Sequence, residues 1–268
     1  MIKTFFFLSG LPRSGSTLLS SILNQNPDIY CSPEQSLICD LMYQNEKYFN
    51  ASEEYHSWTN ESGKNKILKS FIQNYYSHRS EKYIIDKCRS WGTPYNLELI
   101  KNYITDNIKI ICPVRPILEI LASFIKLFHS NGSGAFVDNN IQSNGRLIYR
   151  PMDDVRCDEI MISNGPTDKA LFSMSQHKNH KGVFHFVEYD DLVYNTERTI
   201  QYIYDFLGIQ YFDHSFDNLS SSDEINHGFY GIDKLHKIRS DVSKTSIIPE
   251  DILSEYVLQK YNNYEVWR

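Results

Sequence analysis

The segment FFFLSGLPRSGSTLLSSIL (residues 5–23) decides the fold of this 268-residue chain. It starts as an apolar run typical of a buried strand, passes through a glycine-containing loop, and continues with the pattern of a helix. We predict a strand over residues 4–8 and a helix over residues 17–23. A strand–loop–helix unit directs several backbone N–H groups and the positive end of the helix dipole at one point. The segment therefore predicts an anion-binding site.

The loop GLPRSGST (residues 10–17) has the glycine spacing of a nucleoside-triphosphate P-loop but lacks its lysine. Ser16 stands where that motif needs a lysine to reach the β- and γ-phosphates, whereas Thr17 keeps the hydroxyl of the next position. The nearest cation is Arg13. An ATP site remains an alternative at this point. Asp86 follows an apolar run, as does the aspartate that holds magnesium in ATP-binding proteins. The alternative without a ligand is a turn in which a loop serine caps the helix.

Alternating apolar runs and helical patterns predict an α/β fold, P-loop-like and three-layered, with a central, mainly parallel sheet of about four or five strands flanked by helices. Further strands are expected at residues 83–85, 108–112 and 183–187, and helices at 96–104, 118–128, 196–207, 249–260 and within a polar region at 34–79. We predict one domain over residues 1–268. Residues 131–166 are rich in Gly, Asn and Pro without clear periodicity, which is typical of a functional loop or lid. Residues 209–268 form a C-terminal closing segment.

Composition excludes several classes of protein. With 27 basic and 33 acidic residues the net charge is −6, which argues against a nucleic-acid or anionic-membrane partner. The five cysteines form no CxxC pair, so we expect neither a disulfide framework nor a zinc site, and a reducing, cytoplasmic location. The apolar run at the N-terminus is too short for a signal peptide, and no stretch reaches the ~18 apolar residues of a membrane span. Nothing in the sequence specifies an oligomeric state.

A second motif, VRPILEILASF (residues 114–124), follows the strand expected at 108–112. Pro116 suits the first turn of a helix, and Ser123 then lies on the side of that helix that faces Arg115. An arginine fork suits a phosphate, and the serine hydroxyl could bind the same group. Taken alone, Arg115 is equally consistent with a surface ion pair.

Together these motifs resemble a known family. GLPRSGSTLLSSILNQNP (residues 10–27) resembles the 5′-phosphosulfate loop of sulfotransferases that use 3′-phosphoadenosine 5′-phosphosulfate (PAPS), and VRPILEILASF resembles their 3′-phosphate motif. The stretch VEYDDLVYNTERTIQYIYDFLGI (residues 187–209) also looks like a segment of this family. The resemblance covers most of the chain and is closest to the tyrosylprotein sulfotransferases and related bacterial or viral enzymes.

The resemblance implies a donor site for PAPS, with 3′,5′-ADP as the product and no metal required. The residues that would grip the 5′-phosphosulfate are Arg13, Ser14, Gly15, Ser16 and Thr17. Arg115 and Ser123 would hold the 3′-phosphate, and Tyr189 would contact the nucleotide. The absent P-loop lysine then agrees with a ligand that has no γ-phosphate.

The resemblance also implies catalytic roles. Glu34 would be the general base, with Lys87, Arg13 and Ser240 stabilising charge on the transferring and leaving groups. For Glu34 a structural alternative stays open, since residues 32–35 read as a helix N-cap followed by a capping-box glutamine. For Lys87 the alternative is a solvated lysine at a strand end. The alignment around Ser240 is loose.

We therefore predict an enzyme that moves a sulfuryl group from PAPS to a hydroxyl acceptor by in-line displacement. The acceptor would be a small molecule, sugar, lipid or peptide, with residues 131–166 on the acceptor side. The alternatives are a P-loop kinase, favoured by the glycine spacing and Asp86, and a nucleotide-binding module without turnover.

Overall fold

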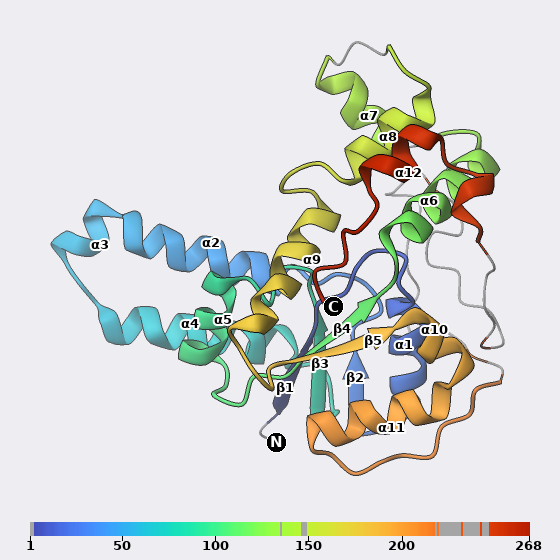
Figure 1. Ribbon diagram of the computed structural model, residues 1–268. Helices are drawn as coiled ribbons and strands as arrows, with labels where there is room; N and C mark the ends of the chain where they lie inside the picture. The colour runs from blue at the N-terminus through green and yellow to red at the C-terminus, as the bar shows by residue number, and fades with distance from the viewer. Residues whose placement is uncertain are drawn as a thin grey trace.

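The computed structural model describes residues 3–134, 136–145, 149–217, 219, 232, 242 and 247–268. Its elements follow in the order β1 (Thr4–Leu8), α1 (Ser16–Leu23), β2 (Ile29–Cys31), α2 (Ile38–Ala51), α3 (Glu53–Ser57), α4 (Glu61–Tyr75), β3 (Tyr83–Lys87), α5 (Pro94–Tyr103), β4 (Ile110–Val114), α6 (Ile117–Asn131), α7 (Phe136–Ser143), α8 (Met152–Ile160), α9 (Pro166–Ser175), η1 (Gln176–Lys178), β5 (Phe184–Glu188), α10 (Tyr189–Tyr194), α11 (Thr196–Leu207), η3 (Pro249–Asp251) and α12 (Glu255–Lys260). The strands form one five-stranded sheet in the order β2-β3-β1-β4-β5, and every pair in it is parallel (Figure 1). The predicted α/β fold is confirmed.

The alternation of side chains along β1 creates two separate cores, one on each face of the sheet. Phe5 and Phe7 belong to the core under α2, α5, α6 and α9, whereas Phe6 and Leu8 belong to the core under α1 and α11 (Figure 1). Four of the five β1 residues are buried, as expected for a central parallel strand covered on both faces. Burial on both faces explains why the strand reads as a continuous apolar run.

The sequence patterns did not predict three short elements, which are β2, α9 and α10. β2 has only three residues and is defined by its pairing with β3, in which Tyr30 lies opposite Ile84. Such a strand has too few residues to show a periodicity. The polar region at 34–79 is confirmed as helical, but it is divided into α2, α3 and α4 by the side-chain caps Ser52 and Asn60.

The expectation of an irregular segment at 131–166 is wrong, because α7 and α8 lie within it. α8 lacks an apolar stripe since it buries the carboxylates of Asp154 and Glu159 together with apolar residues. Asp154 accepts a hydrogen bond from Ser254 Oγ at 2.7 Å, and Ser254 is the N-cap of α12. The helix expected at 249–260 is therefore two pieces, η3 and α12, which are separated by that cap.

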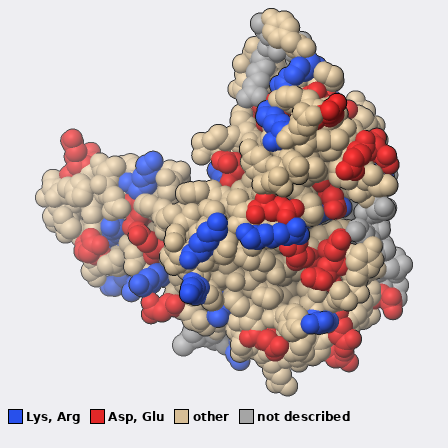
Figure 2. Space-filling model, viewed as in Figure 1, with Lys and Arg blue, Asp and Glu red and all other residues tan. Residues whose placement is uncertain are grey.

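The arm formed by α2, α3 and α4 projects from one side of the sheet, and α7 and α8 form a lobe beyond another edge (Figure 1). In the space-filling view the surface is hollowed between arm and lobe, and both signs of charge are interspersed over this face (Figure 2). None of the helices in the described part of the chain has the length and apolarity to cross a membrane.

Candidate active site

All five strands lead into residues that the sequence singled out. The loop at 10–17 follows β1, Glu34 follows β2, Lys87 ends β3, Arg115 follows β4 and Tyr189 follows β5. Because the strands are parallel, these positions share the carboxyl edge of the sheet, where open α/β sheets bind their ligands. In the sheet, β2 and β3 lie on one side of β1, and β4 and β5 lie on the other. The loop after β1 therefore lies at the topological switch point, where the chain changes sides.

The first loop is held tightly against β4. Leu11 N donates to Pro113 O at 3.0 Å, and a Cβ on Gly10 would lie 2.8 Å from Pro113 Cδ, which is too close for any side chain. Arg13 has a φ of 58° and Gly15 a φ of 87°, so two residues within three positions are left-handed. A left-handed arginine is rare and typical of a functional loop. Such turns direct successive N–H groups at an anion.

The start of α1 carries no side-chain cap. Gly15 is the N-cap and has no side chain to accept a hydrogen bond, and the first turn contains no acidic residue. The alternative in which Ser14 or Ser16 caps the helix is wrong, since Gly15 is the N-cap and the buried Ser14 hydroxyl donates to Leu11 O at 2.6 Å. A helix start without a side-chain cap is suited to an anion.

Two arginines meet beside this loop. Arg115 Nη1 donates to Arg13 O at 3.3 Å, and Arg13 Nε donates to Ser123 Oγ at 3.2 Å. Burial, together with the charge of Arg115, lowers the pKa of Arg13. Ser123 is thus connected to Arg115 by way of Arg13. The predicted pair of Arg115 and Ser123 therefore lies in one cluster with the loop at 10–17. A buried guanidinium next to a partly buried one favours an anionic ligand near both.

Arg115 is held in place from two sides, but one of its guanidinium nitrogens makes no hydrogen bond to the described residues. Its Nε donates to Glu119 Oε2 at 3.0 Å, and its guanidinium lies 4.2 Å from the centre of the Tyr189 ring. Only 3% of Arg115 is exposed, and its Nη2 has no hydrogen-bond partner among the described residues. A buried guanidinium N–H without an acceptor is costly, so this atom indicates a ligand oxygen. Glu119 is not among the residues predicted from the sequence, although its spacing of four residues from Arg115 is typical of a helical ion pair.

Glu34 and Lys87 lie beside one another because the chain after β2 continues along β3. Ser32 N donates to Ile85 O at 3.0 Å and Ser36 N to Lys87 O at 2.8 Å. Lys87 Nζ donates to Pro33 O at 2.9 Å, and Gln35 N donates to Glu34 Oε1 at 2.7 Å. Glu34 does not belong to a helix N-terminus, because α2 begins at Ile38, and the capping-box alternative is wrong. Lys87 is buried rather than solvated.

Asp86 is connected by hydrogen bonds to the segment that carries Glu34. It is fully buried, and its two oxygens accept hydrogen bonds from Trp91 Nε1 at 2.6 Å and from Tyr76 OH at 2.5 Å. Tyr76 OH also bonds Ser32 Oγ at 3.0 Å, which links the carboxylate to the chain that carries Glu34. Burial raises the pKa of Asp86. Its role in the described structure is therefore to fix neighbouring side chains.

Burial lowers the pKa of Lys87 to about 8 from 10.5, and the nearby Glu34 carboxylate partly offsets this effect. Between about pH 8 and pH 10.5 the unfolded chain binds more protons at this residue than the folded chain, so the free energy of unfolding should rise with pH there. We expect Lys87→Met to lack this rise, of about 3 kcal/mol. Urea unfolding of both proteins across this window measures the difference. Lys101→Met, at an exposed position of α5, is the control and should follow the wild-type curve.

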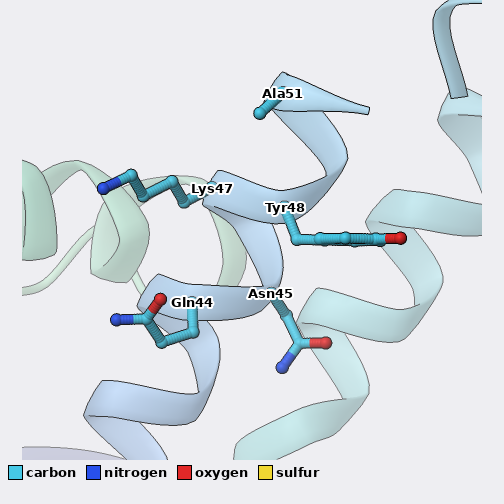
Figure 3. A pocket seen from close by; sticks show the side chains of 5 residues that line it. All are labelled: Gln44, Asn45, Lys47, Tyr48 and Ala51. Carbon is cyan, nitrogen blue, oxygen red and sulfur yellow. The ribbon is translucent and has the colours of Figure 1, made fainter. Parts of the chain in front are cut away.

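Ser240 falls outside the described residues. A hollow of about 480 Å³ lies along α2, lined by Gln44, Asn45, Lys47, Tyr48 and Ala51 (Figure 3). Lys47 and Tyr48 point to opposite sides of the helix, so their polar groups do not converge on a common ligand (Figure 3). The hollow contains none of the charged side chains gathered at the strand ends, and the candidate site is at the strand ends.

Comparisons with known proteins agree with this architecture. The sulfotransferase domain from the curacin biosynthetic pathway is 17% identical, with a TM-score of 0.51 over 99% of this chain and 92% of that one. The mouse sulfotransferase SULT7A1, solved in complex with PAP, is 14% identical, with a TM-score of 0.54 over 98% of this chain and 84% of that one. At these identities the two structures show a shared fold. No curated protein matches the chain.

The sequence itself gives the more specific result. Residues 6–213 match the sulfotransferase family. This range begins in β1 and extends past α11, so it includes the loop after β1 and the residues that follow each of the other four strands. The chain belongs to the sulfotransferase family.

Proposed function

We propose that this sulfotransferase uses PAPS as donor and that Glu34 is the general base for the acceptor hydroxyl. The observation that carries the proposal is the convergence of Arg13, Arg115 and Lys87 with the uncapped start of α1 at one edge of the sheet. These groups suit a ligand with two separate anionic ends.

The 5′-phosphosulfate would bind the loop after β1. N–H groups at Ser16 and Thr17, together with the helix dipole, would meet its oxygens. The Ser14 hydroxyl is turned into the loop, so Ser14 would contribute its backbone N–H. Gly15 would let the loop pass Tyr189, since a Cβ at this position would lie 3.1 Å from that ring.

The 3′-phosphate would bind Arg115, whose Nη2 is buried without a partner among the described residues. Ser123 would act with it through Arg13. The Tyr189 ring, already stacked on the guanidinium of Arg115, would contact the nucleotide from the other side.

The transfer step joins the acceptor oxygen to sulfur and breaks the bond from sulfur to the phosphate oxygen of the donor. Glu34 would take the proton of the acceptor hydroxyl. Lys87, which Pro33 O holds beside Glu34, and Arg13 would stabilise the charge that develops on the transferring and leaving oxygens. Ser240 stays a prediction from sequence, and so does a reaction that needs no metal.

The alternative of a P-loop kinase is less consistent with the described structure. Asp86, the residue that favoured it, is fully buried, and each of its oxygens accepts a hydrogen bond from an aromatic side chain. A magnesium-holding aspartate needs those oxygens free at the phosphate loop. The alternative of a binding module keeps the same donor site and differs only in turnover.

The acceptor would enter near the start of α2, because Glu34 precedes this helix. The helices α7 and α8 in the lobe fall within residues 131–166, the part of the chain expected on the acceptor side. Sugars, lipids, peptides and small hydroxyl compounds all stay possible acceptors.

Thermal unfolding with added nucleotides tests the donor. We expect 3′,5′-ADP to raise the melting temperature and ATP with magnesium to leave it unchanged, since only the former carries the 3′-phosphate that Arg115 would bind. Labelled PAPS with a panel of hydroxyl acceptors, with and without a chelator, then tests turnover. Stabilisation by ATP–magnesium but not by 3′,5′-ADP would contradict the proposal. Stabilisation by 3′,5′-ADP with neither transfer nor PAPS hydrolysis would favour the binding module.

A further inference from the structure

Two cysteines meet beside the proposed catalytic pair. Cys39 is the second residue of α2, and Cys88 follows Lys87 directly. Their sulfur atoms and a carboxylate oxygen of Asp40 all lie within 4.8 Å of one another. Both sulfurs also contact Ser90 Oγ, at 3.5 Å from Cys39 and 3.2 Å from Cys88. All five cysteines of the chain are free thiols.

The two thiols are chemically unequal. A hydrogen bond from Cys39 lowers the pKa of Cys88, and the Ser90 hydroxyl acts in the same direction. Burial raises the pKa of Cys39. A thiolate, rather than a thiol, is the form that attacks an oxidant. The arrangement therefore makes Cys88 the nucleophile and Cys39 the thiol that can react with it in a second step.

The remaining cysteines differ from this pair. Burial raises the pKa of Cys31 to about 11 and also raises the pKa of Cys112 and of Cys157. Cys88 keeps 6% of its surface exposed, whereas Cys31, Cys112 and Cys157 are fully buried. The side chain of Asp40 beside the pair is exposed, so the pair lies just beneath the surface. A small oxidant should therefore react at Cys88 first.

We propose that Cys39 and Cys88 are a redox modification site that forms a reversible disulfide with hydrogen peroxide. The Cys88 thiolate attacks one peroxide oxygen, the O–O bond breaks, and the released hydroxide takes a proton and leaves as water. The Cys39 sulfur then attacks the sulfenic sulfur of Cys88, the S–O bond breaks, and a second water leaves with the Cys39 proton. In total two thiols are oxidised to one disulfide and one peroxide is reduced to two waters.

The disulfide would connect the start of α2 to the end of β3. Forming it requires the sulfurs to approach to about 2.05 Å. Ser36 N and Lys87 O hold the adjoining chains together at 2.8 Å, so displacement of Cys39 and Cys88 should shift Glu34 relative to Lys87. Misplacing catalytic groups by about an ångström lowers the rate on the order of 10-fold to 100-fold. This consequence rests on the proposed function, whereas the covalent step does not.

Peptide mapping of the full chain by mass spectrometry, without reduction, tests the covalent step. After peroxide treatment we expect the wild type to lose the mass of two hydrogen atoms, to yield a Cys39–Cys88 linked peptide, and to recover with dithiothreitol. Cys39→Ser should instead leave a sulfenic acid on Cys88 that dimedone captures. Cys157→Ala, at a buried thiol of α8, is the control and should form the disulfide as the wild type does.

Three outcomes would overturn the disulfide: no mass loss in the folded chain, oxidation first at Cys31, Cys112 or Cys157, or zinc retained one per chain and lost in Cys39→Ser, which would mean a metal site. Turnover with PAPS, measured before and after oxidation, is a separate readout. A chain that forms the linked peptide but is inactive when reduced contradicts the proposed function and leaves the disulfide confirmed. Disulfide formation without a change in turnover overturns only the coupling to Glu34 and Lys87.

Discussion

Arg115→Ala should abolish the thermal stabilisation by 3′,5′-ADP and weaken its binding on the order of 10²–10⁴-fold. The reason is the loss of about two charge-assisted hydrogen bonds to the 3′-phosphate, each worth about 1.5–3 kcal/mol. Arg115 is 3% exposed and its Nη2 has no partner among the described residues, so this buried N–H group can bond the 3′-phosphate without giving up another hydrogen bond. Calorimetric titration with 3′,5′-ADP measures the change.

The substitution also leaves Glu119 without the guanidinium that it pairs with at 3.0 Å. Arg115→Ala combined with Glu119→Gln removes that unpaired carboxylate and separates lost binding from lost stability. Arg198→Ala, at an exposed position on α11, makes the same change of side chain away from the site and should bind normally. Normal affinity in a folded Arg115→Ala protein would show that the 3′-phosphate binds elsewhere.

Glu34→Gln should lower turnover on the order of 10²–10⁴-fold while 3′,5′-ADP binding stays unchanged, because a general base contributes about this much and does not touch the donor nucleotide. The glutamine oxygen can still accept the hydrogen bond that Gln35 N donates to Glu34 Oε1 at 2.7 Å. The local structure should therefore survive. Single-turnover transfer from labelled PAPS, together with calorimetric titration, measures the two effects.

Glu98→Gln on α5 is the matched control, since the same substitution at an exposed glutamate should leave both measurements unchanged. Parallel losses of binding and turnover in Glu34→Gln would mean that Glu34 supports the donor loop. Turnover at the wild-type rate would assign proton removal to another group.

The sequence predicted those parts of the site that lie within one strand–loop–helix unit. The loop at 10–17 and the pair of Arg115 and Ser123 are each readable because their spacing is local, and the structure places both at the carboxyl edge of the sheet. The sequence could not predict which side chains are hydrogen-bonded to one another. Ser123 accepts a hydrogen bond from Arg13 rather than from Arg115. Glu119 pairs with Nε of Arg115, so only the other N–H groups of that guanidinium would bind the phosphate.

Glu34 shows the opposite case. By its neighbours it resembles a helix cap, and the structure instead places it in an irregular segment between β2 and α2, where Ser32 and Ser36 on either side of it are hydrogen-bonded to β3. β2 has three residues and carries no pattern of its own. A strand of this length exists only because a partner strand from elsewhere in the chain lies beside it.

The sequence by itself therefore determined the alternating α/β order, the glycine-containing loop after the first strand and the resemblance to sulfotransferases, because each depends on residues close together in the chain. Tertiary structure decided which side chains meet: Glu34 with Lys87, Arg13 with Arg115, and Cys39 with Cys88. Parallel pairing sets this, since it brings the ends of strands that are far apart in sequence to one edge. Burial at that edge then lowers the pKa of Lys87 and of Arg13, and the hydrogen bond from Cys39 lowers the pKa of Cys88.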